Sequence, residues 1–198
     1  MQKNFILIIL PMLLLVCDKP EEKSDNLLVA ASIPPLADFV RNVGGDRVDV
    51  YTIVPAGVNP HAFELTPGVM KKLTAADLLV LNGVGLEFWL EEVIDVLADK
   101  KAIFMAAGLP VLQDDVHHHA EGNPHLWLDP QNAIHQVKKI YDALAEVDPA
   151  NSSYYASNTA LYVRHLEVLD QDIQQMVDTW PLKKFVCFHP AWEYFARR

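Results

Sequence analysis

The histidines that stand beside prolines are the residues whose type and spacing best suit metal binding in this chain. His61, His125 and His189 each have a proline neighbour, and the three are evenly spaced along the sequence. Neutral imidazole binds zinc at about 2.0–2.1 Å, and zinc prefers four tetrahedral ligands. Three converging histidines would leave the fourth position for a carboxylate or water. The spacing is far longer than in a zinc finger, so only the fold could assemble such a site, and residue types alone leave convergence open.

The elements that must position these histidines are predicted by alternating sequence patterns. Short apolar runs predict strands, and apolar residues at helical spacing predict helices between them. The strands are expected at 27–32, 47–54, 77–83 and 101–108, and the helices at 34–45, 66–76 and 86–99. This alternation predicts an α/β fold, in which a four-stranded parallel sheet has flanking helices on both faces.

Each of the three histidines follows a predicted strand. His61 comes after the strand that ends near Val54, and His125 lies in the long loop after the fourth strand. His189 directly follows a further strand expected at 184–188. Loops beyond the carboxyl ends of parallel strands converge on the ligand crevice of an open sheet. The fold therefore offers a route by which the three imidazoles could meet.

A long uninterrupted helical pattern follows the first lobe. Asp129-Pro130 and Asp148-Pro149 each offer a helix N-cap with proline at the first helical position. No glycine or internal proline interrupts residues 150–180, which predicts a helix of about 45 Å. We expect an N-terminal metal-binding lobe at 27–147, a long linker helix at 148–180, and only the first βα element of a second α/β lobe at 181–198.

The N-terminal segment has the pattern of an export signal. Residues 5–16 are apolar after a start that carries Lys3. Twelve residues are too few to span a bilayer but suit the core of a signal peptide. The run ends in "LLVC", which resembles a bacterial lipobox with Cys17 as the lipidated residue. We expect a signal peptide at 1–17 and a solvated tether at 18–26, with export without a lipid as the alternative.

Overall charge excludes one class of partner. The chain carries 16 basic and 26 acidic residues, for a formal net charge of −10. Nucleic-acid binding needs clustered lysine and arginine, so no nucleic-acid partner is expected. The second cysteine, Cys187, lies in the apolar run "KFVCF", which predicts a buried free thiol.

Five stretches resemble, in order, segments of the metal-binding subunits of bacterial zinc and manganese ABC importers. They are "NPHAFELTP", "ADLLVLNGVGLEFWL", "NPHLWLDPQNA", "DPANSSYYASNTALYVRHLEVLDQDI" and "KKFVCFHPAWEYFA". They lie between residues 59 and 196, and the resemblance extends over nearly all of residues 27–198. The resemblance implies two α/β lobes joined by one stiff helix, with a metal ion in the cleft between them.

The resemblance also implies a ligand set. His61 and His125 match the two ligands of the first lobe, and His189 matches the third. Histidine at the third position goes with zinc-binding members and glutamate with manganese, so we expect Zn²⁺ in preference to Mn²⁺. The fourth ligand of the family, usually an aspartate, lies late in the second lobe. The sequence ends before that point, so we expect a chain truncated after the third ligand motif.

Two further features have more than one interpretation. The run His117, His118 and His119 resembles the His-rich loop of zinc-binding members, which suggests low-affinity capture or sensing; a solvated loop with incidental metal affinity is the alternative. Glu64 lies three residues after His61 and could orient that imidazole as a hydrogen-bond acceptor. A solvated loop carboxylate is equally compatible with its position.

The leading functional hypothesis is a non-enzymatic zinc-capture protein outside the cytoplasm. It would be a monomer that hands zinc to the membrane permease of an ABC importer, and lipid on Cys17 could anchor it to the membrane. A zinc hydrolase that uses the three histidines and a bound water is a second hypothesis, although no HExxH or GxSxG motif occurs. A fragment without zinc function of its own is the third.

Overall fold

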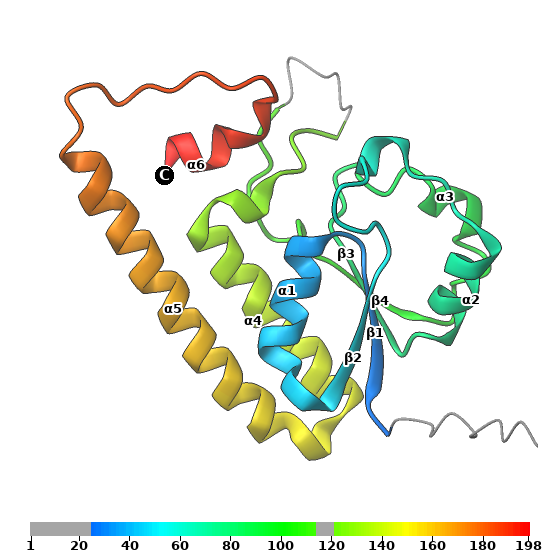
Figure 1. Cartoon of the computed structure of the whole chain (residues 1–198). Helices are drawn as coiled ribbons and strands as arrows, with labels where there is room; N and C mark the ends of the chain where they lie inside the picture. The colour runs from blue at the N-terminus through cyan, green and yellow to red at the C-terminus, as the bar shows by residue number, and fades with distance from the viewer. Residues whose placement is uncertain (1–24, 114–120) are drawn as a thin grey trace, which may run out of the picture.

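A parallel β-sheet lies at the centre of the molecule (Figure 1). The computed structural model describes residues 25–113 and 121–198. Within these residues four strands follow the order β2-β1-β3-β4, and all neighbouring pairs are parallel. Their bounds are Leu27–Ala31 (β1), Val48–Thr52 (β2), Leu78–Leu81 (β3) and Lys101–Phe104 (β4). The predicted four-stranded parallel sheet is confirmed.

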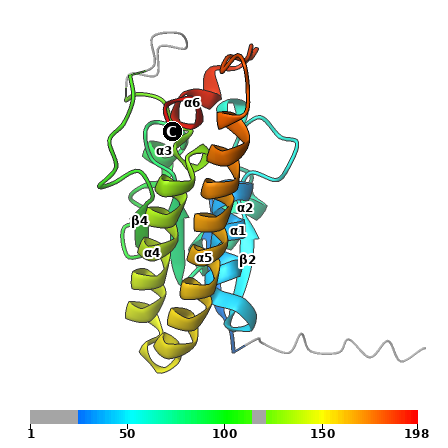
Figure 2. The same ribbon diagram turned by 90° about the vertical axis from the view of Figure 1, so that its left-hand side faces the viewer.

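Helices cover both faces of this sheet, as predicted (Figures 1 and 2). One face packs against α1 and α4, which are covered in turn by α5, and the other face packs against α2 and α3. The helices run over Pro34–Gly44 (α1), Pro67–Ala75 (α2), Leu90–Val93 (α3), Pro130–Val147 (α4) and Ser152–Asp178 (α5). Successive strand residues point to opposite faces, so Val29 and Ala30 enter different core clusters. Burial on both faces explains why β3 reads as the continuous apolar run LLVL.

The long helix α5 packs beside α4 over most of its length, as far as the hydrogen bond from Gln131 to Asp170 (Figure 2). Its 27 residues correspond to about 40 Å, close to the prediction. Tyr155 is fully buried, and its hydroxyl donates to Asp148 Oδ2 at 2.6 Å. Asp148 therefore binds a side chain within α5, whereas Asp129 caps α4 by accepting from the Gln131 N–H at 2.8 Å. No helix among the described residues has the length and apolar character needed to cross a membrane.

The segment after α5 differs from the prediction. No strand forms at 184–188; the backbone crosses from α5 to the short helix α6 (Glu193–Arg197) without pairing to the sheet (Figure 1). Val186 and Phe188 are 95% and 107% exposed. A strand needs a neighbour for its backbone hydrogen bonds, and none lies beside this segment. The βα element predicted at 181–198 is therefore represented by its helix alone, and Cys187 is exposed rather than buried.

The helix predicted at 86–99 is also shorter than expected. Only Leu90–Val93 is α-helical, and turns with i→i−3 hydrogen bonds surround it, such as Leu90 N–H to Glu87 O at 3.0 Å. The Glu87 carboxylate accepts from the backbone N–H groups of Asn82 and Gly83 at 2.7 and 2.9 Å. This tie to the end of β3 holds the start of the segment against the sheet and replaces a regular first helical turn.

Candidate metal centre

The loops beyond the carboxyl ends of the strands gather at one edge of the sheet. The loop after β2 leads to the 3-10 turn η2 (Pro60–Ala62), which contains His61. The loop after β4 leads to His125, directly before the turn η3 (Leu126–Leu128). His189 precedes the turn η5 (Pro190–Trp192), which runs into α6. One cavity of about 650 Å³ is lined by residues of the loop after β2 together with both His125 and His189.

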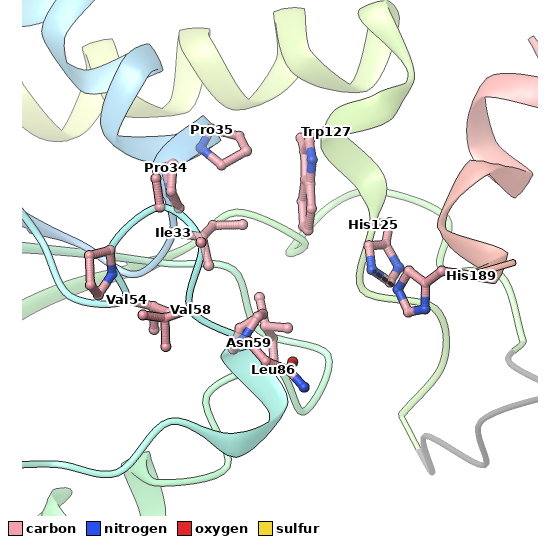
Figure 3. A pocket seen from close by; sticks show the side chains of 14 residues that line it. Ile33, Pro34, Pro35, Val54, Val58, Asn59, Leu86, His125, Trp127 and His189 are labelled. Atoms are coloured by element: carbon pink, nitrogen blue, oxygen red, sulfur yellow. Dashed lines mark hydrogen bonds between the residues drawn. The ribbon is translucent and has the colours of Figure 1, made fainter.

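His125 and His189 face each other across a short distance (Figure 3). Their Nε2 atoms are 3.0 Å apart, and their rings meet edge to face with centroids 4.8 Å apart. Two tetrahedral zinc ligands at the usual bond length have nitrogens about 3.3 Å apart. The two nitrogens therefore lie within a few tenths of an ångström of the separation that two ligands of one zinc ion would have. The structure brings together two of the histidines singled out in the sequence.

The imidazole of His125 is oriented by Asn123. His125 is 8% exposed, and its Nδ1 lies 2.8 Å from Asn123 Oδ1. The same oxygen accepts the backbone N–H of His125 at 3.0 Å. An amide oxygen can only accept, so Nδ1 carries the proton and the lone pair of Nε2 faces His189. A metal-binding histidine typically has such a partner on its second nitrogen.

A buried polar cluster of Asn82 and Glu87 holds the backbone directly before His125. Asn82 is fully buried, and its Nδ2 donates to the carbonyl of Pro124 at 2.9 Å. Glu87 holds the backbone of Asn82 and is 7% exposed. Burial raises the pKa of the Glu87 carboxyl, although its hydrogen bonds from the backbone of Asn82 and Gly83 act in the opposite direction. These contacts tie the residue before His125 to the end of β3.

Apolar side chains form most of the remaining wall. Pro34, Pro35 and Trp127 line the cavity with Val54 and Val58 (Figure 3). The ring of Trp127 lies 5.2 Å from that of His125, measured between centroids. Apolar walls lower the local dielectric constant and strengthen the attraction between a cation and its ligands.

The roles predicted for the other site residues are not tested by the described part of the structure. His61 belongs to η2, but its side chain is not among those described. Among the described side chains, no group of three or more histidines, cysteines or carboxylates comes together, so the three-histidine set stays a prediction. Glu64 is exposed, and its orienting role is also untested. The lipidation residue Cys17 and the histidines 117–119 lie outside the described residues.

The structure adds residues that were not recognised in the sequence. Asn123 and Asn82 hold the loop of His125, and Glu193 and Tyr194 contact Asn123 from α6. One signal was present, because the tripeptide Asn-Pro-His occurs at both 59–61 and 123–125. The contacts from α6 left no such signal, because they join residues about seventy positions apart in the sequence.

The four-stranded parallel sheet and its histidine-bearing loops define an α/β lobe with a candidate metal site at the carboxyl ends of the strands. The chain belongs to the family described as zinc-uptake complex component A, periplasmic, whose model matches residues 29–198. A zinc-bound crystal structure of a ZnuA deletion mutant is 37% identical with a TM-score of 0.82, covering 87% of this chain and 66% of that one.

Curated relatives include proteins named for two different metals. The manganese ABC transporter substrate-binding lipoprotein PsaA of Streptococcus pneumoniae is 32% identical over 197 residues, which cover 93% of this chain and 64% of PsaA. The zinc-binding lipoprotein AdcA of S. pneumoniae serotype 4 is 28% identical over 92% of this chain and 39% of AdcA. PsaA is named as a substrate-binding component of a transporter, and AdcA as a metal-binding lipoprotein. The chain spans slightly less than two thirds of the length of PsaA.

Proposed function

We propose that this protein captures Zn²⁺ outside the cytoplasm and delivers it to the membrane permease of an ABC importer. The observation that carries the proposal is the 3.0 Å separation between the Nε2 atoms of His125 and His189 at the mouth of a cavity. His61 is proposed as the third ligand, because Asn59 and Pro60, which directly precede it, line the same cavity as His125 and His189. The ion is cargo, so the site binds and releases it without chemistry.

Zinc is proposed over manganese on the chemistry of the donors. Imidazole suits zinc, whereas manganese favours carboxylate, carbonyl and water oxygens, and Mn²⁺ stands at the weak end of the divalent affinity series. Both described donors are imidazoles. The names of the relatives include both metals, so this preference rests on the ligand atoms of this chain.

The cellular setting is proposed from the family and the N-terminal sequence. The protein is exported, and lipid on Cys17 anchors it to the outer side of the membrane, as the lipoprotein names of the relatives suggest. It acts as a monomer that presents the cleft edge to the permease. No turnover of ester substrates is expected, because cargo binding needs no general base.

A chelator-competition titration of the full chain tests the proposal. One tight site with a nanomolar Kd, about −12 kcal/mol, is expected for zinc and a far weaker one for manganese. His61→Ala, His125→Ala and His189→Ala should each weaken zinc binding by more than about 100-fold, beyond the typical effect of an outer-shell partner. His135→Ala is the matched control, because His135 is exposed on α4.

Two outcomes would contradict the proposal. Binding that ignores all three substitutions and disappears when residues 117–119 are deleted would assign zinc to the His-rich loop alone. A tighter site for manganese than for zinc would overturn the choice of metal but leave the transport class in place.

A further inference from the structure

The segment that contains His189 also contacts the residue that orients His125. Asn123 Nδ2 donates to Glu193 Oε2 at 3.2 Å. Glu193 is the first residue of α6 and lies four positions after His189. Residues 189–194 therefore carry the imidazole of His189 and also hold Asn123, which orients the imidazole of His125.

Two opposite demands fix the amide orientation of Asn123. The backbone N–H of His125 can only donate, so it must face the amide oxygen. The Glu193 carboxylate oxygen that contacts Asn123 is an acceptor, so it must face the amide NH₂. A flipped amide would place donor against donor and acceptor against acceptor, losing both hydrogen bonds. Glu193 therefore supports the same orientation that the contacts to His125 require.

The orientation of Asn123 in turn selects the tautomer of His125. With Oδ1 at 2.8 Å, the proton belongs on Nδ1 and the Nε2 lone pair faces His189. With the amide flipped, its NH₂ would face Nδ1 and favour the proton on Nε2, the atom needed for a metal. The net contribution of one such hydrogen bond is enough to shift a tautomer ratio severalfold.

Tyr194 holds the backbone of the same residue. Its hydroxyl donates to the carbonyl of Asn123 at 2.8 Å and accepts the N–H of Leu112 at 2.9 Å. Tyr194 is 4% exposed, so this anchor lies in the interior. Backbone and side chain of Asn123 are thus both held by α6.

We propose that Glu193 is a positioning residue that acts through Asn123 to fix the tautomer and direction of His125. When residues 189–194 pack against the loop of Asn123, they bring His189 into the site and fix the tautomer of His125 at the same time. The effect on metal affinity rests on the proposed zinc function, whereas the effect on the tautomer does not.

The tautomer is measured on the metal-free full chain. Two-bond ¹H–¹⁵N correlation spectra of His125 in mildly alkaline solution, where imidazole is neutral, distinguish Nδ1–H from Nε2–H. The native protein should show the Nδ1–H form, and Glu193→Ala should show a mixture. Glu193→Gln should retain the native form, because its amide oxygen can still accept from Asn123. Glu167→Ala, an exposed carboxylate on α5, is the matched control and should leave the spectrum unchanged.

A rescue variant separates positioning from a general structural role. Aspartate at position 123 presents an oxygen in either orientation, so Asn123→Asp combined with Glu193→Ala should restore a pure Nδ1–H form. Loss of packing around α6 would not be rescued in this way. If Glu193→Ala lowers the folded fraction in a thermal melt, Glu193→Asp supplies the same measurement with the charge kept and the reach shortened by one methylene.

Zinc titration of the same variants completes the test. Glu193→Ala should weaken zinc binding by about 10–100-fold, and Glu193→Gln should bind nearly as the native chain does. An unchanged Nδ1–H form in Glu193→Ala, or no recovery in the double variant, would overturn the proposal. If His125→Ala leaves zinc affinity unchanged, the proposed zinc site fails, and the tautomer result still decides the role of Glu193.

Discussion

Gly122 places the loop of Asn123 against the neighbouring chain segment, at a point where a side chain has no room. Its φ is +108°, in the region that favours glycine, and an added Cβ would lie 2.6 Å from the carbonyl oxygen of Leu112. That same oxygen accepts the N–H of Asn123 at 2.7 Å. The position of Asn123, which orients His125, therefore depends on the absence of a Cβ atom at Gly122.

Replacing Gly122 by alanine should disturb the metal site from outside it. We expect Gly122→Ala to lower the free energy of unfolding by about 1–3 kcal/mol, because of the strained φ and the displaced Leu112. Zinc affinity should fall as well, since Asn123 moves with the loop. Urea unfolding and zinc titration measure the two effects. Gly68→Ala in α2 is the control: it meets only Thr66 Oγ1 at 3.7 Å and should leave zinc binding at its native level.

Residue types reveal ligands more readily than they reveal the groups that orient ligands. His125 and His189 stood out because imidazole is a specific metal-binding group and both residues follow predicted strands. Asn123 and Glu193 are ordinary surface residue types, and their roles depend on a contact between positions seventy residues apart. Only the folded chain brings such pairs together, so the support of the site could not be predicted from the sequence.

At the scale of elements, the start of α5 is held by one strong hydrogen bond. The Tyr155 hydroxyl donates to Asp148, which lowers the pKa of that carboxyl below its usual range. The carboxylate also accepts from Asn151 Nδ2 at 2.7 Å. Because the folded-state pKa is lowered, this contribution is fully present above the ordinary aspartate pKa of about 3.9. It is lost as the pH falls through the folded-state pKa.

Tyr155→Phe tests this contact through the pH dependence of stability. We expect the free energy of unfolding near neutral pH to fall by about 1 kcal/mol. The acid-side decline should also become shallower, because Asp148 then titrates closer to its ordinary range. Urea unfolding at a series of pH values provides both quantities. Tyr154→Phe is the neighbouring control, since its hydroxyl is partly exposed and accepts one longer bond, from Asp46 N–H at 3.3 Å; equal effects in the two variants would contradict the assignment.

The elements were predictable where their own residues determine them. The apolar runs of β1 and β3 and the proline-capped start of α4 formed as the patterns indicated. Residues 184–188 have strand-forming types but no neighbour to pair with, and residues 86–99 follow the tie between Glu87 and β3. Both predictions were wrong for the same reason. The residue pattern of a segment reveals its own preference but not the hydrogen-bond partners that the rest of the fold provides.

At the scale of the whole molecule, α6 is fastened to the first lobe by a charged cluster. Arg198 donates to both oxygens of Asp170 on α5, at 2.9 and 2.6 Å. Gln131 at the start of α4 donates to the same carboxylate at 2.9 Å. The hydrogen bond from Arg198 lowers the pKa of Asp170, so this fastening persists above the ordinary aspartate range and is lost on acidification. Three helices meet at one carboxylate that is 5% exposed.

Asp170→Asn should loosen α6 and, with it, the position of His189. We expect a decrease of about 1 kcal/mol in the free energy of unfolding, because Arg198 remains partly exposed to screening by solvent. Zinc binding should weaken several-fold, since His189 lies on the released segment. Asp178→Asn is the control, because its ion pair with Lys183 is exposed on both sides. Native zinc affinity in Asp170→Asn would show that the cluster does not support the site.

The exposed Cys187 gives this cleft a natural attachment point for a reporter group. Its thiol stands two residues before His189 on the segment that lies free of the sheet. In a chain with Cys17 replaced by serine, a maleimide dye would react at this single position. Its emission would then follow the arrival of a metal ion and the settling of residues 189–194 as they occur, without any engineered cysteine.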